Sequence, residues 1–501
     1  MKAIARRGRV PAVLVLLLLA ANGAAQTHAS IEDMAGTPTL PTFTSLASFD
    51  ESNGAYPGGA TLIQATDGNF YGTVGKGGVN GDGTAFKITP SGALSTLYSF
   101  CSLANCTDGS IPGGGLIQGT DGNFYGVTVF GGAFGYGTVY KMTADGLVTT
   151  LHSFANAGDG VNPVGALVQS NGSFYGITQY YTAAANEQGT VYRITPAGVL
   201  TTLYYFCSQS NCADGTFPAQ GLIVASDGNL YGETTEGGAA GSCQQASYGC
   251  GTVYRLTPSG TLTSLHSFAG YPQEGEGPGG GLVQARDMNL YGTSFEGGTN
   301  NTGTAFRITT GGVFSTIYNF CPQYVHNSQC PYGRSPYGGL VQATDGKLYG
   351  ATNAGGTRGD YGTLYKLTTQ GTFTVQHSFD STDGAYPSNA DLVQGTDGSF
   401  YGVTQNGGST GVGTGFNLSV GLAPFIETQT ASGKAGSQVV ILGTNLSGAT
   451  AVSFNGTAAA FTVISSSEIK ATVPQGAASG LVVVTTSSAT LTSNKTFRVL
   501  K

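Results

Sequence analysis

Short runs that alternate apolar and polar residues recur along most of this chain. Each copy begins with a run such as Leu62–Ala65, followed by an Asp-Gly dipeptide such as Asp121-Gly122. A second run contains Phe/Leu-Tyr-Gly, a third resembles Gly137–Met142, and a fourth resembles Leu94–Phe100. Runs of about four to eight residues rich in Val, Ile, Thr, Tyr and Phe, bounded by Gly, Pro and Asp, are typical of β-strands. Each copy therefore predicts a unit of four antiparallel strands.

The Tyr-Gly step of the second run sets the period of the repeat. Successive copies are 54, 50, 56, 60, 58 and 52 residues apart. Four strands in a repeat of roughly 50 residues predict one blade of a β-propeller. The seven tyrosines are Tyr71, Tyr125, Tyr175, Tyr231, Tyr291, Tyr349 and Tyr401.

The two ends of the repeat region predict how the ring closes. The fourth-strand pattern occurs once before the first repeat, at Phe43–Phe49, and the last repeat stops at its third strand, Gly413–Leu418. A ring in which Phe43–Phe49 completes the last blade leaves no unpaired strand edge at the join. We therefore predict an all-β fold, a seven-bladed β-propeller of four-stranded blades closed by its N-terminal strand. A β-solenoid or stacked array is the alternative, and it gives no reason for the strand at Phe43–Phe49.

Different patterns flank the repeats. Residues 1–29 have a positively charged start, the apolar run Val10–Ala21 and small residues before Gln26, which together predict a signal peptide. An uncleaved anchor is the alternative. We expect a linker over 30–42, the propeller over 43–420, and an immunoglobulin-like β-sandwich over 421–501, because short alternating strands follow one another there. We expect a secreted protein, extracellular or at the cell surface, that is monomeric and does not insert into membranes after the signal is removed.

The charge balance excludes two classes of partner. The chain has 20 basic and 27 acidic residues, and without the four cations of the leader the count is 16 against 27, a net charge of −11. Nucleic acid and anionic lipid both require a basic surface. We therefore expect no nucleic-acid partner.

Two families are recognisable in these patterns. Asp-Gly-Asn-Phe-Tyr-Gly, the following Gly-Gly and the run of Gly-Thr-Val-Tyr-Lys-Ile-Thr-Pro-Ser-Gly type resemble the GloVer tandem repeats of exported bacterial proteins, over residues 43–418. Gly-Thr-Asn-Leu and Val-Ser-Phe-Asn-Gly-Thr within Pro424–Val499 resemble the IPT/TIG immunoglobulin-like domains of secreted bacterial proteins. The second resemblance implies a spacer or adhesive module, and the first implies no established biochemical role.

The eight cysteines fall into four close couples. A secretory leader favours disulfides, and no Cys-x-x-Cys spacing of a zinc site occurs. We expect four local disulfides, with zinc as the alternative, and we expect no metal and no cofactor. The couples are Cys101/Cys106, Cys207/Cys212, Cys243/Cys250 and Cys321/Cys330.

The connections between strands fall into two sets that emerge on opposite faces of the predicted ring. The first-to-second and third-to-fourth turns are short and uniform, and we call their side the turn face. The second-to-third loops and the fourth-to-first crossovers vary in length and contain every cysteine, and we call their side the crossover face. Variable loops on a rigid scaffold tend to carry binding function. We therefore predict that the crossover face is the working surface.

Aromatic rings beside carboxylates on these loops suit the apolar faces and hydroxyl groups of sugars. The alternative is that each ring packs within its own loop, and the absence of Trp counts against a dedicated carbohydrate site. The candidate ligand-binding residues are Phe130, Phe134, Tyr136, Tyr180, Tyr181, Glu236, Tyr248, Glu296, Tyr324 and Tyr361.

Few residues suggest catalytic chemistry, and we name no catalytic residue. Glu233 and Glu236 could form a carboxylate pair with Glu296 for glycoside chemistry, although solvated loop acids are the favoured explanation. Three histidines occupy a fourth-strand position that is Tyr in other copies, so we expect them to be structural: His152, His266 and His377. A cation recurs on the third strands, and we expect it near the turn aspartates: Lys87, Lys141, Arg193, Arg255, Arg307 and Lys366.

These observations favour a secreted, non-enzymatic binding or adhesion protein for an extracellular glycan or a cell-surface partner. The alternative is a secreted carbohydrate-active enzyme, a polysaccharide lyase or a glycoside hydrolase, on the same scaffold. An enzyme needs titratable groups that converge in a concave site. Convergence of such groups therefore separates the two hypotheses.

Overall fold

The computed structural model describes residues 40–57, 59, 61–180, 189–238, 243, 249–323, 330–387 and 391–500. Within these ranges the secondary structure is β-strand, with three short 3₁₀ turns at Ala104–Cys106, Ser210–Cys212 and Leu446–Gly448. In the same ranges no helix is long and apolar enough to cross a membrane. The all-β class expected from the sequence is confirmed.

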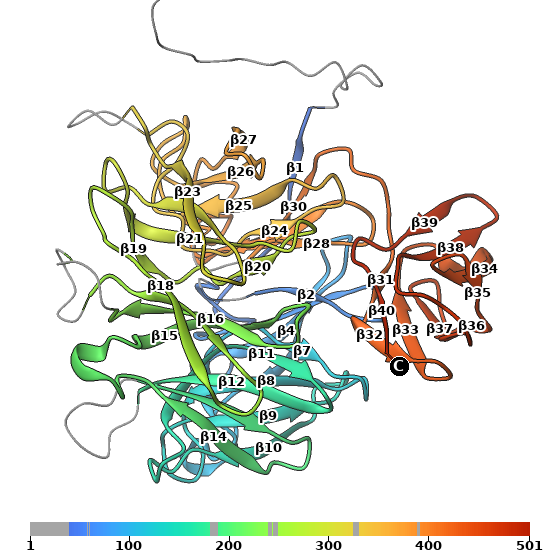
Figure 1. Cartoon of the computed structure of the whole chain (residues 1–501), viewed down its shortest axis with the longest axis horizontal. Coiled ribbons are helices and arrows are strands. Elements are labelled where there is room, and N and C mark those ends of the chain that lie inside the picture. Colours follow the sequence, from blue (N-terminus) through green and yellow to red (C-terminus); the bar gives the residue numbers. More distant parts are fainter. Residues whose placement is uncertain are drawn as a thin grey trace, which may run out of the picture. The chain divides into compact units, whose positions relative to one another are not determined.

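The repeats form antiparallel sheets in chain order (Figure 1), and the third and fourth repeats join into one eight-stranded sheet through a parallel pairing of Ala166 with Gly221. The first strand of each repeat is short in most copies, and the third strand lies between the second and the fourth. The strands are β2 (Ile63–Gln64), β3 (Phe70–Val74), β4 (Thr84–Ile88) and β5 (Leu94–Ser99); β6 (Ser110–Pro112), β7 (Ile117–Gln118), β8 (Phe124–Phe130), β9 (Thr138–Met142) and β10 (Val148–Ser153); β11 (Val161–Ser170), β12 (Ser173–Tyr180), β13 (Thr190–Ile194) and β14 (Leu200–Tyr205); β15 (Thr216–Val224), β16 (Leu230–Glu236), β17 (Thr252–Leu256) and β18 (Leu262–Ser267); β19 (Gly275–Pro278), β20 (Val283–Gln284), β21 (Leu290–Gly297), β22 (Thr304–Ile308) and β23 (Phe314–Asn319); β24 (Val341–Gln342), β25 (Leu348–Thr352), β26 (Thr363–Leu367) and β27 (Phe373–Ser378); and β28 (Val393–Gln394), β29 (Phe400–Thr404) and β30 (Thr414–Ser419).

The strand that precedes the first repeat, β1 (Thr42–Ser48), pairs with the last strand of the repeat region. It runs antiparallel to β30, with Phe43 opposite Leu418, and the two strands lie side by side in Figure 1. The Phe43 ring also stacks on His377 with 3.8 Å between ring centroids. Backbone hydrogen bonds therefore connect the two ends of the repeat region, and ring packing connects β1 to the sixth repeat.

The Asp-Gly turns owe their uniformity to one hydrogen-bond network. In the first repeat, Asp67 accepts hydrogen bonds from the Asn69 amide at 3.0 Å and from the Tyr71 hydroxyl at 2.8 Å. The buried Tyr71 ring then stacks on Phe124 of the next repeat, with centroids 4.3 Å apart. Each turn is thus tied to its own second strand and to the neighbouring repeat. The same Tyr–Asp bond joins Tyr125 to Asp121, Tyr231 to Asp227, Tyr291 to Asp287, Tyr349 to Asp345 and Tyr401 to Asp397.

The third-strand cations lie beside this network, as expected. Arg255 is paired in register with Tyr231, whose hydroxyl bonds to Asp227. Burial tends to raise the pKa of Asp227, but hydrogen bonds from Asn229 and Tyr231 and the charge of Arg255 hold that pKa below its ordinary value. These cations therefore belong to the turn face.

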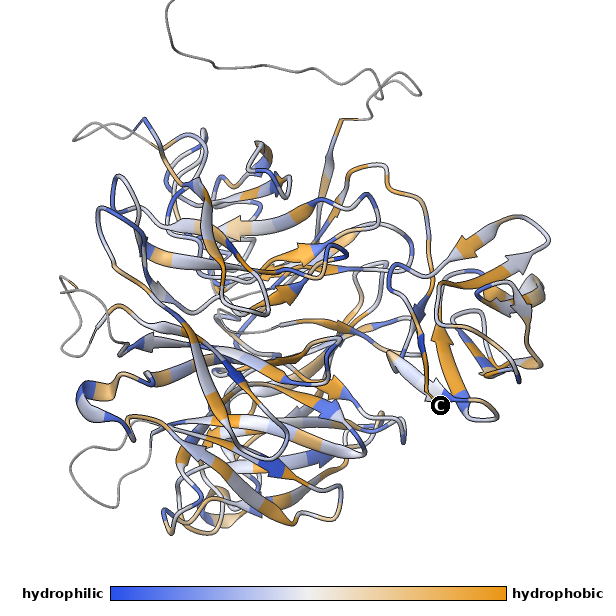
Figure 2. Cartoon of the chain, viewed as in Figure 1, coloured by the Kyte–Doolittle hydropathy of each residue, from blue (hydrophilic) through white to orange (hydrophobic). Residues whose placement is uncertain are grey.

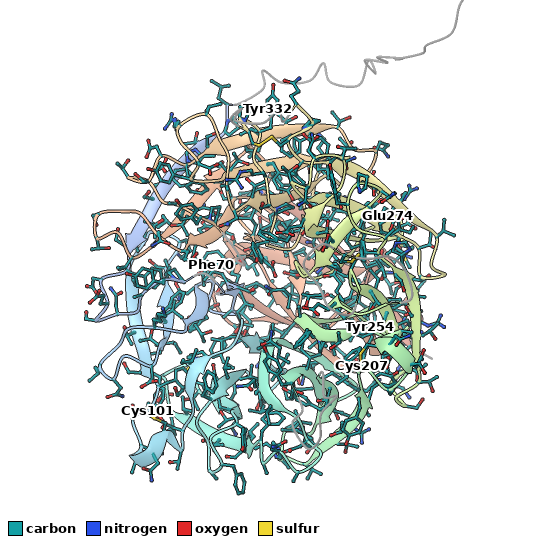
Figure 3. All side chains as sticks on the ribbon, turned by 90° about the vertical axis from the view of Figure 1, so that its left-hand side faces the viewer. Phe70, Cys101, Cys207, Tyr254, Glu274 and Tyr332 are labelled. Carbon is teal, nitrogen blue, oxygen red and sulfur yellow. A yellow bond between two sulfur atoms is a disulfide. The ribbon has the colours of Figure 1, made fainter. Side chains whose placement is uncertain are left out.

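The four expected disulfides are present (Figure 3). Each closes a loop of only 5 to 9 residues, because both cysteines come from the same connection between strands. Short bridges of this kind brace one loop and constrain the rest of the chain little. The bonds are Cys101–Cys106, Cys207–Cys212, Cys243–Cys250 and Cys321–Cys330.

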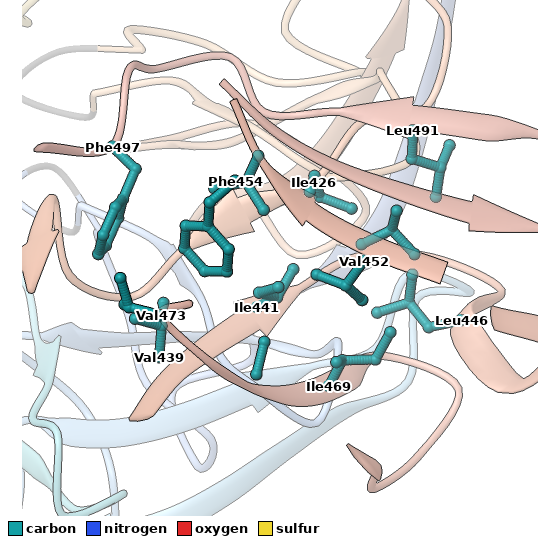
Figure 4. Close-up of a cluster of buried hydrophobic side chains, with 13 residues drawn as sticks. Ile426, Val439, Ile441, Leu446, Val452, Phe454, Ile469, Val473, Leu491 and Phe497 are labelled. Carbon is teal, nitrogen blue, oxygen red and sulfur yellow. The ribbon is translucent and has the colours of Figure 1, made fainter. Parts of the chain in front are cut away.

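The C-terminal segment has its own core between two sheets, with the apolar run of β33 visible in Figure 2. Figure 4 shows Phe454, Ile441 and Ile469 of this core, all of which are buried. Burying each such side chain contributes about 1.5–3 kcal/mol relative to exposure. The strands are β31 (Glu427–Thr428), β33 (Gln438–Leu442), β37 (Glu468–Thr472) and β36 (Phe461–Val463) in one sheet, β35 (Thr457–Ala458), β34 (Ala449–Phe454), β38 (Val482–Thr486) and β39 (Thr490–Thr492) in the other, and the pair β32 (Ser432–Lys434) and β40 (Arg498–Leu500).

This C-terminal segment hydrogen-bonds to the Asp-Gly turns of several repeats. Leu40–Lys501 form one compact unit that contains both. The bonds reach the turn face of the repeats, so they leave the crossover face to other contacts. They join Ser467 to Thr66, Gln429 to Gly119, Arg498 to Ser226, Asn494 to Arg286 and Thr444 to Thr396.

Candidate functional site

Several of the predicted aromatic residues are exposed on the crossover face. Phe130 ends β8 and Tyr180 ends β12, and both keep more than a third of their surface exposed, as do Phe134 and Tyr136. Phe134 is the most open of them, with 61% of its surface exposed. These four side chains are therefore available to a partner. Tyr181, Tyr248 and Tyr324 lie outside the described residues.

Two of the predicted tyrosines contact aromatic residues of the following crossover. Tyr180 lies edge-to-face against Phe217, with ring centroids 5.4 Å apart. Tyr361 lies edge-to-face against Tyr386, with centroids 6.0 Å apart. Aromatic pairs of this kind bridge the end of one repeat and the start of the next.

The predicted acids Glu236 and Glu296 make no direct contact with each other among the described residues. Glu236 ends β16 and Glu296 lies in β21, and burial raises the pKa of both, with Glu276 adding its charge beside Glu296. Across the described residues, no hydrogen bond, ion pair or electrostatic interaction joins Glu236 to Glu296. Within the described part of the chain, no contact therefore links the two acids of the crossover face.

The expectation that Glu233 is a solvated loop acid is wrong. Its side chain is 1% exposed and lies within β16. Residues that directly follow the Tyr-Gly step point into the protein interior, where other repeats place Val127 or Ile177. Strand alternation therefore buries this carboxylate.

The three fourth-strand histidines hold the crossover loops in place. The Nε2 atoms of His152 and His266 lie 3.0 and 2.9 Å from carboxylate oxygens of Asp159 and Glu274 (Figure 3 labels Glu274). His377 is placed in the same way, 2.9 Å from Asp383. In other repeats a tyrosine hydroxyl makes the equivalent bond, as from Tyr98 to Asp108 and from Tyr204 to Asp214. This exchange of His for Tyr fits the structural role expected from the sequence.

A repeated backbone feature lies in the crossover that leads into each repeat. One residue directly before a proline adopts a left-handed conformation, with φ between 52° and 61° in all copies. Side chains other than glycine adopt this conformation at a cost, so the surrounding structure must hold it. In the first repeat the Tyr56 amide donates to the Val412 carbonyl at 2.8 Å, and in the second the Ile111 amide donates to the Asp82 carbonyl at 2.9 Å. The residues are Tyr56, Ile111, Asn162, Phe217, Gly277, Ser335 and Tyr386.

These left-handed residues present different side chains from one shared backbone position. We call them the crossover ring. The aromatic residues Tyr56, Phe217 and Tyr386 of this set are not among the candidates predicted from the sequence. Their sequence signal is an X-Pro step a few residues before each first strand, as at Tyr56-Pro57 and Tyr386-Pro387.

A cavity of about 500 Å³ opens beside two members of the crossover ring. Small-molecule sites commonly span about 300–1,000 Å³. The Lys76 ammonium lies 5.6 Å from the centroid of the Tyr56 ring, which keeps 38% of its surface exposed. The cavity joins the first, second and last repeats, and it is lined by Tyr56, Gly59, Thr73, Gly75, Lys76, Ile111, Pro112, Gly113, Gly114, Gln405 and Asn406.

The chemistry of this lining suits binding. It offers an aromatic ring, one cation, the amides of Gln405 and Asn406, and bare glycine backbone. Among the described residues that line it there is no carboxylate and no histidine.

Two models of known protein families match this chain. The Gloeobacter/Verrucomicrobia repeat matches residues 16–245, 120–330 and 322–449, and the IPT/TIG domain matches residues 424–499. No curated protein matches the sequence.

Similar solved structures have low sequence identity. Two are described as extracellular domains of hybrid two-component systems from B. thetaiotaomicron, with identities of 10% and 11% and TM-scores of 0.48 and 0.47. The matches cover 92% and 80% of this chain but only 57% and 45% of those chains. A gluconolactonase from Xanthomonas campestris has 16% identity and a TM-score of 0.38, with 62% of this chain and 87% of that chain covered. The repeats that fill most of its length and the segment at 424–499 identify this chain as a member of the Gloeobacter/Verrucomicrobia repeat family that carries an IPT/TIG domain.

Proposed function

We propose that this chain is a secreted, non-enzymatic binding protein that recognises an extracellular glycan or a cell-surface partner through its crossover face. In this proposal residues 1–29 are a signal peptide, 30–42 a linker, 43–420 a seven-bladed propeller and 421–501 the IPT/TIG domain. Four local disulfides support an extracellular location, because such bonds persist in oxidising compartments.

Two contacts support a closed ring of seven blades. The β1–β30 pairing supplies the last sheet with a fourth strand. Tyr401 of the last repeat stacks on Phe70 of the first repeat, with 3.9 Å between the ring centroids. Tyr71 and Phe124 of consecutive repeats make the equivalent contact. The first and last repeats therefore meet as neighbours do elsewhere along the chain.

The observation that carries the binding proposal is the cavity beside Tyr56. The Tyr56 ring suits the apolar face of a pyranose, since aromatic side chains combine a large apolar face with a polar tip. The amides of Gln405 and Asn406 suit hydroxyl groups, and Lys76 suits a carboxylate or a further hydroxyl. The candidate residues Phe130, Phe134, Tyr136, Tyr180, Glu236, Glu296 and Tyr361 would extend the contact over the same face.

A glycan array tests this function. The mature protein, with and without residues 424–501, is applied to immobilised neutral and acidic glycans, and the best ligand is then incubated with the protein and analysed by mass spectrometry. We expect selective binding that survives removal of 424–501, and we expect the glycan to be recovered intact. Cleaved or eliminated product would favour the carbohydrate-active enzyme instead, and an absence of selective binding would contradict a glycan ligand.

A further inference from the structure

A carboxylate is buried between two repeats without a full set of partners. Glu233 Oε2 accepts a hydrogen bond from the Gly281 amide at 2.9 Å. Glu233 Oε1 is buried and has no hydrogen-bond partner among the described residues. Other repeats have Val127, Ile177 or Val403 at this position, so the fold does not need a carboxylate there. A buried polar atom without a partner is costly, and its presence calls for an explanation.

A second acid, Asp391, contributes its charge to the electrostatic environment of Glu233. Asp391 is half-buried, and its Oδ1 accepts the Gly339 amide at 2.6 Å, while its Oδ2 lies 3.5 Å from the Thr61 hydroxyl. Asp391, Gly281 and Gly339 each directly precede the leucine that opens a first strand, so they occupy equivalent positions in three repeats. Glu233 therefore reaches the same ring of first-strand positions to which Asp391 belongs.

Neither carboxylate has a cationic partner among the described residues. Burial raises the pKa of Glu233 to about 8, against the hydrogen bond from Gly281, and the charge of Asp391 adds to the rise. Burial also raises the pKa of Asp391, to about 6. No lysine, arginine or histidine in the described ranges forms an ion pair with either group. Buried charges are usually paired or bound to a metal.

Glycine backbone borders both carboxylates, and the Phe306 and Leu282 side chains lie beside the same Gly292 position as Glu233 Oε1. A Cβ atom at Gly292 would lie 2.8 Å from Glu233 Oε1, and a Cβ atom at Gly339 would lie 2.8 Å from Asp391 Oδ1 and 2.5 Å from the Gly280 carbonyl oxygen. At Gly339 the absence of a side chain thus leaves Asp391 close to a backbone carbonyl group. Carboxylate and carbonyl oxygens are the ligands of hard cations such as Ca²⁺, whose coordination distances of about 2.3–2.6 Å tolerate irregular geometry.

We propose that Glu233 and Asp391 bind a hard cation, with Ca²⁺ as the favoured ion, in the interior of the repeat region. Glu233 Oε1 and Asp391 Oδ2 are the carboxylate ligands, and backbone carbonyls of the neighbouring glycines complete the oxygen set. The cation supplies the positive charge that the described side chains do not, and it replaces the proton that Glu233 otherwise holds. The site is separate from the cavity beside Tyr56, whose lining contains neither acid.

The test uses the full mature chain, stripped with EDTA and dialysed. Isothermal titration with CaCl₂ at pH 7.5 is run beside MgCl₂, NaCl and KCl, and thermal unfolding is followed with each ion. We expect one Ca²⁺ per chain, a higher melting temperature with Ca²⁺, and tighter binding at pH 8.5 than at pH 6, because the ion competes with the proton.

Two variants and one control separate this site from other acids. Glu233→Gln and Glu233→Val, the latter taking the residue of other repeats, should weaken Ca²⁺ binding at least tenfold while the far-ultraviolet spectrum stays unchanged. The exposed Asp145→Asn should bind as the wild type does. Equal binding by wild type and both Glu233 variants overturns the proposal. So does a melting temperature that depends on pH but responds to none of the four ions, because the acids would then share only a proton.

Discussion

Replacing Glu233 with glutamine should change how the stability of this protein depends on pH. Burial raises the pKa of the carboxyl from 4.5 to about 8, so the folded state holds the proton more tightly than the unfolded state does. Stability from this group is therefore fully present below pH 4.5 and is lost as the pH rises to about 8. Glutamine keeps the size and the acceptor for the Gly281 amide but does not ionise.

The size of this change in stability follows from the difference between the pKa values of Glu233 in the folded and unfolded states. Each pKa unit corresponds to about 1.4 kcal/mol, so the full difference corresponds to at most about 5 kcal/mol in the free energy of unfolding. Asp391, whose pKa rises from 3.8 to about 6, acts in the same direction at lower pH. Between pH 6 and pH 8 we therefore expect a loss of about 3 kcal/mol in the wild type, mostly from Glu233.

Urea unfolding in EDTA, followed by tyrosine fluorescence at half-unit steps from pH 5 to 8.5, measures this difference. The wild type should lose stability across the range, while Glu233→Gln should remain nearly flat above pH 6.5. Saturating Ca²⁺ should restore the wild type at pH 8 and leave the variant unchanged. Parallel pH profiles for the two proteins would refute the argument, because Glu233 would then ionise in the folded state as it does in water.

Three further predictions concern the ring and its loops. Deleting residues 40–49 should lower the melting temperature by more than 10 °C in differential scanning calorimetry, because β30 loses its partner strand; an unchanged melting temperature would refute the pairing. Tyr401→Leu removes the contact with Phe70, and Tyr71→Leu removes the contact with Phe124. Each variant should lower the free energy of unfolding in urea by about 1–3 kcal/mol. A negligible effect of Tyr401→Leu alone would mean that the first and last repeats do not meet. Reducing the four disulfides should change the melting temperature by only a few degrees, because the closed loops are short. Reduction should nevertheless make the Cys101–Cys106 and Cys207–Cys212 loops susceptible to proteolysis. Global unfolding on reduction would contradict this prediction.

The regular part of this fold could be predicted because each repeat contains the same local sequence pattern. Asp67-Gly68 specifies the turn, and the alternation around Phe70-Tyr71 specifies the strand that follows. The hydrogen bond from the Tyr71 hydroxyl to Asp67 was not anticipated, although the spacing of the two residues is constant in most copies. Comparing repeats would also have revealed Glu233, since its equivalents are apolar or threonine.

The cavity could not be predicted in the same way. Tyr56 and Gln405 are far apart in the sequence, and they meet only because the first and last repeats are neighbours in space. The left-handed backbone of Tyr56 and Ile111 is a tertiary effect, because a residue before proline ordinarily prefers an extended conformation. Composition and spacing therefore predicted a working face on which this cavity lies, but not the residues that line the cavity.

The measurement that tests the central claim most directly is isothermal titration of the best array ligand into the wild type, Tyr56→Ala, Lys76→Met and the control Tyr332→Ala. Tyr332 is an exposed tyrosine outside the cavity lining, so its loss should leave binding unchanged. We predict that Tyr56→Ala and Lys76→Met each weaken binding at least tenfold with melting temperatures within 2 °C of the wild type. Wild-type affinity in both cavity variants would contradict a binding site at this cavity.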